Sequence, residues 1–141
     1  PTGIARAGFL AAAVATVVNL ALFLLARAAG VAFTVGIPGR GRVTVEAPGV
    51  AILTAAPMLL GTAVAQLLAR RLALGLRLAQ VAGGAVGLAS LLAPASVRAA
   101  TATKIALGTM HVVAAVAFVL GLEAVRRRWG ALNGPVRPRA A

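Results

Sequence analysis

Four long apolar stretches, separated by short segments that carry the charged residues, dominate the pattern of hydrophobic and polar positions. The stretches cover residues 5–29, 50–69, 74–93 and 105–125. Each reaches the roughly 20 residues that a helix needs to cross a bilayer core of about 30 Å. The pattern predicts one domain over residues 1–141, an all-α membrane protein built as an antiparallel bundle of four transmembrane helices.

The first apolar stretch also has an alternative interpretation as a cleaved signal peptide. Ala26-Arg27-Ala28 has the small-x-small form of a cleavage site. The apolar core of a signal peptide is about 7–15 residues long, and the run between Arg6 and Arg27 is longer than that. We therefore expect this segment to be the first membrane span.

Residues 31–47, between the first two apolar stretches, alternate apolar and polar positions around the turn-forming segment 36–41. A period of two is typical of strands that bury one face. Pairing Thr34 with Thr44 would bring four apolar side chains onto one face of the pair: Phe33, Val35, Val43 and Val45. The segment predicts a small extracytoplasmic β-hairpin, which either caps the outer ends of its own helices or docks a partner chain.

Composition agrees with a lipid environment. Hydrophobic residues make up 61% of the chain and charged residues 11%, whereas a soluble domain carries about 25% charged residues. The net charge of +12 could indicate nucleic-acid binding, but the basic residues lie at the edges of the apolar stretches and form no stripe with aromatic residues. We expect the lipid bilayer, and no nucleic acid, as the partner.

The basic residues also predict an orientation, because cytoplasmic segments collect lysine and arginine. Nine of them lie in the N-terminal segment, residues 70–77 and the tail, against five in the other two connections. Both termini are therefore predicted on the cytoplasmic side of a bacterial plasma membrane. The basic tail, residues 126–141, either only determines this topology or also contacts anionic inner-leaflet lipids through four residues at its start: Arg126, Arg127, Arg128 and Trp129.

Few polar residues lie inside the apolar stretches, where they are costly. On the predicted topology every span places at least one of them at a similar depth in the outer half of the bundle: Asn19, Thr54, Ser90, Thr109 and His111. One interpretation is a hydrogen-bond network that sets the register of the helices. The other is a ligand pocket or proton-sensitive site around His111, since histidine titrates near neutral pH.

Other residues in the stretches have structural interpretations. Gly83 and Gly87 have the GxxxG spacing that lets two helices approach closely, and we expect it to serve packing inside the chain. Glu123 lies three and four residues before Arg126 and Arg127, which predicts ion pairs along one helix.

No signature of enzyme chemistry occurs in the sequence. The chain has no cysteine and one histidine, which excludes thiolate chemistry and paired axial haem ligands. No metal-ligand cluster, phosphate-binding loop or nucleophile motif is present. We expect no cofactor and no enzymatic activity. The absence of a mid-membrane carboxylate also argues against ion-coupled export of the small multidrug-resistance kind.

Three segments are distinctive: RAGFLAAAVATVVNLALFLLARAAGVAFTV, VTVEAPGVAILTAAPMLLG and ATATKIALGTMHVVAAV. Their most specific elements are Asn19, Phe33-Thr34-Val35, Pro57 and Met110-His111. Over nearly the whole chain they resemble a family of uncharacterised actinobacterial four-helix membrane proteins. The resemblance implies the topology and supplies no catalytic residues. The strand-bearing loop is also similar in architecture to claudins, whose tryptophan and cysteine signature is absent here.

These patterns lead to two functional hypotheses. The first is a small multi-pass membrane protein without enzymatic activity, which acts as a structural or accessory subunit or as a homo-oligomer. The alternative is a membrane protein that binds or transports a small molecule or lipid through the polar residues around Asn19 and His111.

Overall fold

The four apolar stretches form long helices in the computed structural model, which describes residues 2–39 and 41–133. The helices are α1 (Thr2–Ala28), α2 (Ala47–Arg71), α3 (Gly75–Ala89), which the short α4 (Leu92–Ser96) follows, and α5 (Thr101–Asn133). Counting α3 and α4 as one span, all four are long and apolar enough to cross a membrane. The predicted four-helix architecture is confirmed.

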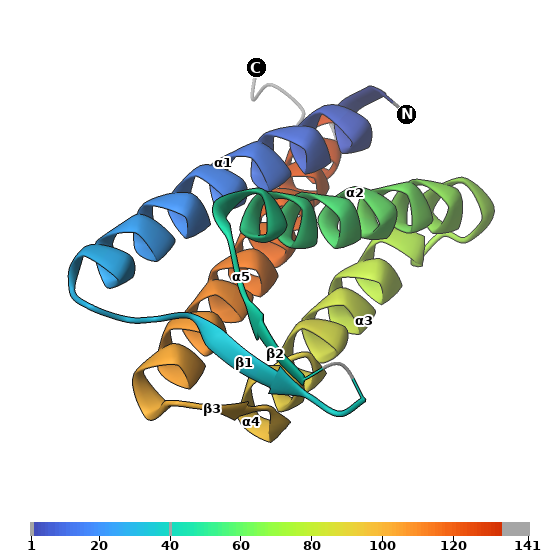
Figure 1. The fold of residues 1–141 in the computed structure, drawn as a ribbon. Coiled ribbons are helices and arrows are strands. Elements are labelled where there is room, and N and C mark those ends of the chain that lie inside the picture. The colour runs from blue at the N-terminus through green and yellow to red at the C-terminus, as the bar shows by residue number, and fades with distance from the viewer. Residues whose placement is uncertain (1, 40, 134–141) are drawn as a thin grey trace, which may run out of the picture.

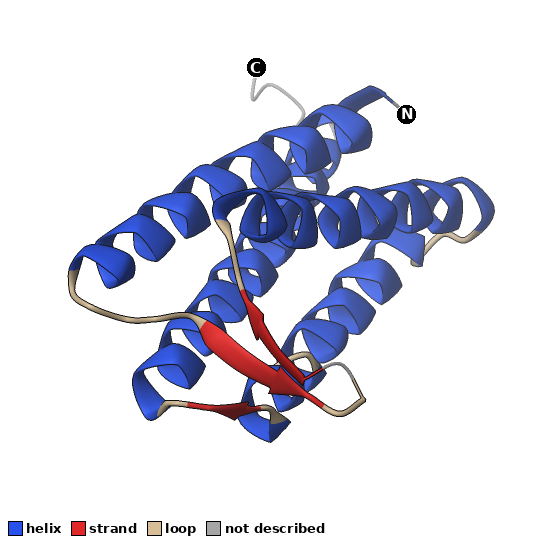
Figure 2. Cartoon of the chain, in the orientation of Figure 1, coloured by secondary structure: helices blue, strands red, loops and turns tan. Residues whose placement is uncertain are grey.

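The helices form a ring in which α1 and α3 each pack against both α2 and α5. α1 begins and α5 ends at the same end of the bundle, together with the α2–α3 connection, and the strands lie at the opposite end (Figures 1 and 2). We call these the terminal end and the sheet end.

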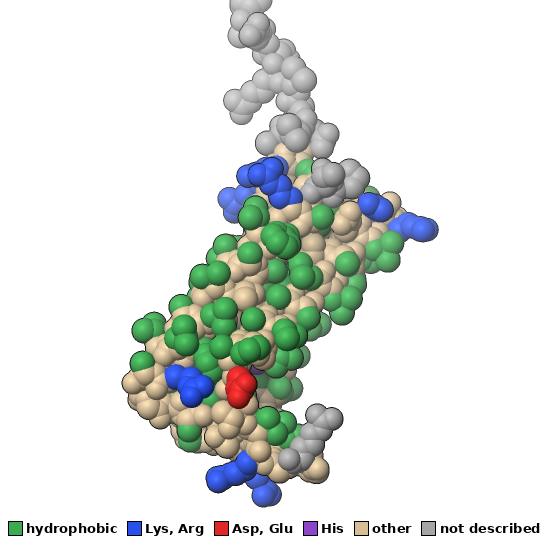
Figure 3. Space-filling model, turned by 45° about the horizontal axis from the view of Figure 1, so that its top comes forward, with side chains coloured by type: hydrophobic (Ala, Val, Ile, Leu, Met, Phe, Trp, Pro, Cys, Tyr) green, Lys and Arg blue, Asp and Glu red, His purple; other side chains and the backbone are tan. Residues whose placement is uncertain are grey.

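The outer surface of the helices is apolar. Large side chains such as Leu53 and Val81 are 74% and 73% exposed. Lysine and arginine side chains gather at the two ends of the bundle, and hydrophobic side chains cover the face between them (Figure 3). A surface of this size and kind is unfavourable in water but matches the hydrocarbon core of a bilayer. The fold is that of a multi-pass membrane protein.

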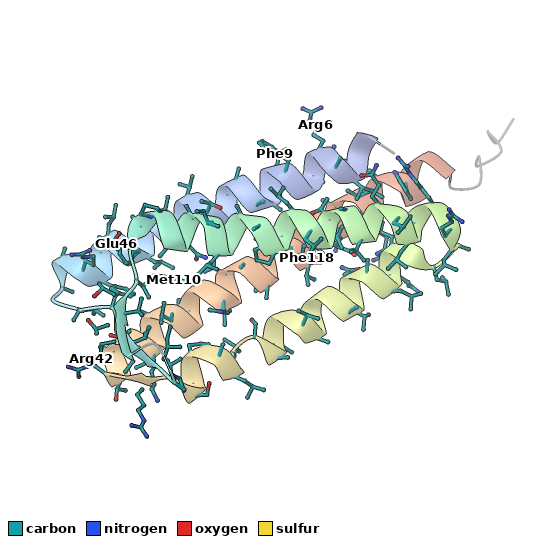
Figure 4. All side chains as sticks on the ribbon, turned by 45° about the vertical axis from the view of Figure 1, so that its right-hand side comes forward. Arg6, Phe9, Arg42, Glu46, Met110 and Phe118 are labelled. Carbon is teal, nitrogen blue, oxygen red and sulfur yellow. The ribbon has the colours of Figure 1, made fainter. Side chains whose placement is uncertain are left out.

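Glycine brings α3 and α5 close together. A Cβ on Gly83 would overlap the ring of Phe118, and one on Gly87 would lie 2.5 Å from the Cβ of Ala115. Phe118 and Met110 lie between the helices, whereas Phe9 points away from them (Figure 4). The GxxxG pair therefore serves packing inside the chain, as expected.

The helix of the third span is interrupted before residue 93, where the prediction ended the span. α3 stops at Ala89, and Pro94 lies inside α4. Proline has no N–H to donate and its ring clashes with the carbonyl four residues earlier, here that of Ser90. The helix is interrupted at Ser90, whose carbonyl instead accepts a hydrogen bond from the N–H of Ala93 at 3.2 Å. The Ser90 hydroxyl donates to the carbonyl of Gly87 at 2.6 Å.

The helix of the fourth span extends beyond the residues predicted for the span. The prediction ended it at residue 125 and assigned 126–141 to a tail, but α5 continues to Asn133. Arginine favours helix, and two of the arginines pair with Glu123 along the same helix. Arg137 and Arg139 of the predicted tail lie outside the described residues.

The predicted hairpin is confirmed in its register. β1 (Thr34–Ile37) pairs antiparallel with β2 (Gly41–Thr44), with Thr34 opposite Thr44 and Val35 opposite Val43. A third strand, β3 (Arg98–Ala99), pairs with the other edge of β1. A strand of two residues is too short to show an alternation of apolar and polar positions, so the sequence did not predict β3. The sheet joins the α1–α2 connection to the one before α5.

Candidate functional site

Asn19 is the centre of the polar contacts inside the bundle. It is 1% exposed, and its Nδ2 donates to Thr54 Oγ1 on α2 and to the carbonyl of Met110 on α5, both at 3.0 Å. One side chain thus joins three helices. Because a carbonyl can only accept, the bond to Met110 fixes which amide atom is the nitrogen.

That orientation leaves an acceptor unused. Asn19 Oδ1 is buried and has no hydrogen-bond partner within the described part of the chain, and the same holds for Thr16 Oγ1, nearly one turn earlier on α1. Buried polar atoms normally have a partner, and leaving one unpaired costs about 1–3 kcal/mol. Two such atoms on neighbouring turns therefore set this region apart from the apolar core.

The other polar residues predicted at this depth bond within their own helices. Ser90 donates to Gly87 as described above, Thr109 Oγ1 donates to the carbonyl of Ile105 at 2.9 Å, and His111 Nδ1 lies 2.8 Å from the carbonyl of Leu107. The structure thus brings Asn19 and Thr54 together, whereas Ser90, Thr109 and His111 hydrogen-bond only within their own helices in the described part of the chain. Sequence reasoning missed the Met110 carbonyl, since a backbone atom leaves no trace in the residue pattern.

No metal centre is assigned. Across residues 2–39 and 41–133, no three histidine, cysteine, aspartate or glutamate side chains gather into a set that could hold a metal ion.

At the sheet end, Phe33 packs into the bundle. It is fully buried, and its ring centroid lies 4.6 Å from that of Phe23 on α1, with the rings tilted by 48°. Both rings belong to a core cluster with Val50 and Met110. The hairpin therefore covers the ends of its own helices.

The predicted docking residues differ in exposure. Phe33 and Val35 are buried, Val45 is half-buried, and Val43 is 39% exposed. β2 is an edge strand whose four residues are all exposed. The surface that the hairpin offers to a partner is therefore β2, and the apolar side chains of β1 face inward.

At the terminal end, Glu123 ties α3 to α5. Its carboxylate accepts two hydrogen bonds from Arg126 at 2.7 Å and one from Arg127 at 2.8 Å, which confirms the predicted pairs. Gln80 of α3 adds a third partner, since its Nε2 lies 3.2 Å from Glu123 Oε2 and 3.4 Å from the carbonyl of Val119.

A groove of about 240 Å³ opens beside this network. It is lined by the α2–α3 connection together with Arg77, Arg126 and Trp129. Two predicted lipid-contact residues, Arg126 and Trp129, thus share a groove with Arg77, which lies on α3. Of the other two, Arg127 bonds Glu123, and Arg128 is exposed.

Four apolar helices, a lipid-facing surface and a polar interior contact at Asn19 define a helical multi-pass membrane protein. The chain belongs to a family of unknown function, DUF6069, whose model matches residues 1–128. The expected membership of a family without an assigned activity is therefore confirmed. No curated protein and no solved structure matches the chain significantly.

Proposed function

We propose that this protein is a non-enzymatic structural or accessory subunit of a bacterial plasma membrane, which associates with itself or with a larger membrane complex. The observation that carries the proposal is that Asn19 hydrogen-bonds to two other helices. This polar side chain is 1% exposed and joins α1, α2 and α5 through its two hydrogen bonds. These interhelical hydrogen bonds stabilise the packing of the bundle.

The positions of the basic residues support an orientation with the terminal end in the cytoplasm. Among the described residues, that end holds Arg6, Arg70, Arg71, Arg77, Arg126, Arg127 and Arg128, and the sheet end holds Arg27, Arg42, Arg98 and Lys104. The larger number on the terminal end follows the bias of cytoplasmic segments. The predominance of arginine over lysine is typical of a GC-rich genome such as that of an actinobacterium.

The terminal-end groove supports contact with anionic lipids of the inner leaflet. Arg77 and Arg126 supply charge, and Trp129 is the type of residue that anchors helices at the interface. This contact would hold the protein at one depth in the membrane.

For association with a partner chain, the exposed edge of β2 is the surface that the fold supports best. The N–H of Val45, just after β2, donates to the carbonyl of Phe33, just before β1. Because successive N–H groups of a strand point to opposite sides, that of Thr44 points away from β1. An outward N–H on an edge strand can pair with a strand of another chain.

Native mass spectrometry of the protein extracted in a mild detergent tests the proposal. We expect the chain in a defined complex, either of several copies or with another membrane protein. Thr44→Pro removes the outward N–H and should release the partner, whereas Thr44→Val, which keeps the N–H, should retain it. A monomer without a protein partner, recovered from every detergent tried, would contradict the proposal.

A second candidate function rests on the unpaired Asn19 Oδ1 and Thr16 Oγ1. A polar group of a bound small molecule or lipid could donate to them, which would make this region a binding site. A mass adduct on the wild-type protein that is absent from Asn19→Leu would support this function. Without such an adduct, the second candidate fails.

A further inference from the structure

A groove at the sheet end takes no part in the helix packing described above. It has a volume of about 970 Å³, and its walls come from β1, β2, β3 and the start of α5. Its polar lining residues are Thr34, Arg42, Arg98 and Thr103. In Figure 4, Arg42 marks the sheet end, far from Arg6 at the other end of the bundle.

The two arginines lie on the same face of the sheet. Arg42 on β2 and Arg98 on β3 are both directly opposite Gly36 of the central strand. Directly opposed residues of an antiparallel pair share a face, and two strand spacings separate the two Cα atoms by about 10 Å. Gly36 has no side chain to separate the arginines, so both guanidinium groups can reach one ligand.

No acidic side chain neutralises these arginines. The ion pairs of the described chain join Glu123 to Arg126 and Arg127 at the terminal end. Arg42 and Arg98 form none with described residues. Two like charges on one face of a small sheet repel each other, and a bound anion would relieve that repulsion.

The start of α5 adds donors to the same groove. The first helical bond runs from the N–H of Lys104 to the carbonyl of Ala100, so the N–H groups of residues 101–103 lack acceptors within the helix. Ala100, just before the helix, has no side-chain oxygen to cap them. The N-terminus of a helix attracts anions through such N–H groups and through its dipole.

Thr103 provides an independent indication of a ligand. It lines the groove and is 1% exposed, and its hydroxyl has no hydrogen-bond partner among the residues that the structure describes. Thr103 Oγ1 is not among the fully buried unpaired oxygens of the described residues, which are those of Thr16 and Asn19, so it keeps a small accessible surface in the groove that it lines. An oxygen of an anion in the groove would supply the missing acceptor.

We propose that this groove binds a phosphate-type oxyanion through Arg42, Arg98, the Thr103 hydroxyl and the first N–H groups of α5. Arginine suits phosphate because its planar guanidinium can donate two parallel hydrogen bonds. The volume is that of a small-molecule site rather than of a bare ion. The ligand is therefore a phosphoester, either soluble or part of a lipid headgroup.

The test uses the full chain in nanodiscs. In neutral phosphatidylcholine discs, glycerol phosphate is titrated by calorimetry. In discs that also contain phosphatidylglycerol, the retained lipid is counted by native mass spectrometry. Binding of glycerol phosphate identifies a soluble phosphoester as ligand, and selective retention of phosphatidylglycerol identifies a lipid headgroup.

Two variants and one control relate that binding to the groove. Arg42→Gln/Arg98→Gln should weaken it about tenfold or more, and Thr103→Val, which keeps the shape of the side chain, about threefold. Arg27→Gln removes the same type of charge at the same end without lining the groove, and should bind as the wild type does. The melting midpoint of each variant shows whether it is folded. If the double arginine variant is misfolded, binding by Thr103→Val provides the test. Absence of binding by both probes, binding that neither variant weakens, or an equal loss in Arg27→Gln would overturn the proposal.

Discussion

Asn19 of α1 and Thr54 of α2 lie 35 positions apart in sequence, yet Nδ2 of the first is 3.0 Å from Oγ1 of the second. The same amide also donates to the carbonyl of Met110 on α5. Both bonds are buried in the interior of the bundle. The relationship shows how a bundle of largely uniform apolar helices acquires a single register.

Asn19→Leu should lower the stability of the bundle by about 1 kcal/mol, because interhelical hydrogen bonds in membranes contribute about 0.6 kcal/mol each on average. Reversible unfolding in a mixture of detergent and dodecyl sulfate measures the change. Thr109→Val is the control, since the Thr109 hydroxyl bonds only its own helix. Equal stabilities for the two variants would mean that Asn19 does not fasten the helices.

Gly87→Ala should destabilise the bundle by about 1–3 kcal/mol, because the added Cβ would lie 2.5 Å from that of Ala115 on α5. Gly84→Ala is a matched control on the same helix. Its Cβ would lie 3.6 Å from the nearest atom, of Val119, and alanine favours helix more than glycine does. Its stability should equal or exceed that of the wild type. If Gly87→Ala were fully stable but changed the oligomeric state, the glycine would serve contacts between chains.

Glu123→Gln should lower the melting midpoint, since the carboxylate joins two arginines and Gln80. The loss should shrink at high salt, which screens ion pairs near the surface. The chain has one other acidic residue, Glu46, which is exposed and pairs with none of the described basic residues. Glu46→Gln should melt as the wild type does. A larger effect at Glu46 than at Glu123 would contradict the assignment.

Replacing both Phe33 and Val45 with serine should destabilise the protein by about 3 kcal/mol or more, because a buried aromatic ring is lost from the cluster with Phe23. Val43→Ser, on the exposed strand β2, should have little effect. Thermal melts in detergent compare the two. If the double variant were stable but lost a co-purifying protein, these side chains would instead dock a partner.

The sequence predicted the helices and strands whose residues follow a regular pattern of apolar and polar positions. Arginines at the edges of apolar runs located the spans, and the period of two around residues 36–41 predicted the strand register. The interruption at Ser90 was not predicted, because it depends on how the chain accommodates Pro94 four residues later. β3 was not predicted either, since its two residues become a strand only through pairing with β1.

For the polar residues, the sequence indicated depth but not direction. Successive residues of a helix differ by about 100° around its axis. A small difference in how a helix is rotated about its axis therefore decides which side chains meet. Met110 is 5% exposed and its carbonyl bonds Asn19, whereas its neighbour His111 bonds the carbonyl of Leu107 on its own helix. The sheet-end groove could not be predicted, because it requires β3 to place Arg98 opposite Gly36.

Cysteine labelling in intact cells tests the central claim, a bundle that crosses the membrane with its two ends on opposite sides. The natural chain has no cysteine, so a single introduced thiol gives the whole signal. Pro38→Cys lies in the exposed turn between β1 and β2, and Ala73→Cys in the exposed α2–α3 connection. With a membrane-impermeant maleimide, we expect Pro38→Cys to react in intact cells and Ala73→Cys to react only after the membrane is opened. Reaction of both positions in intact cells would contradict this account.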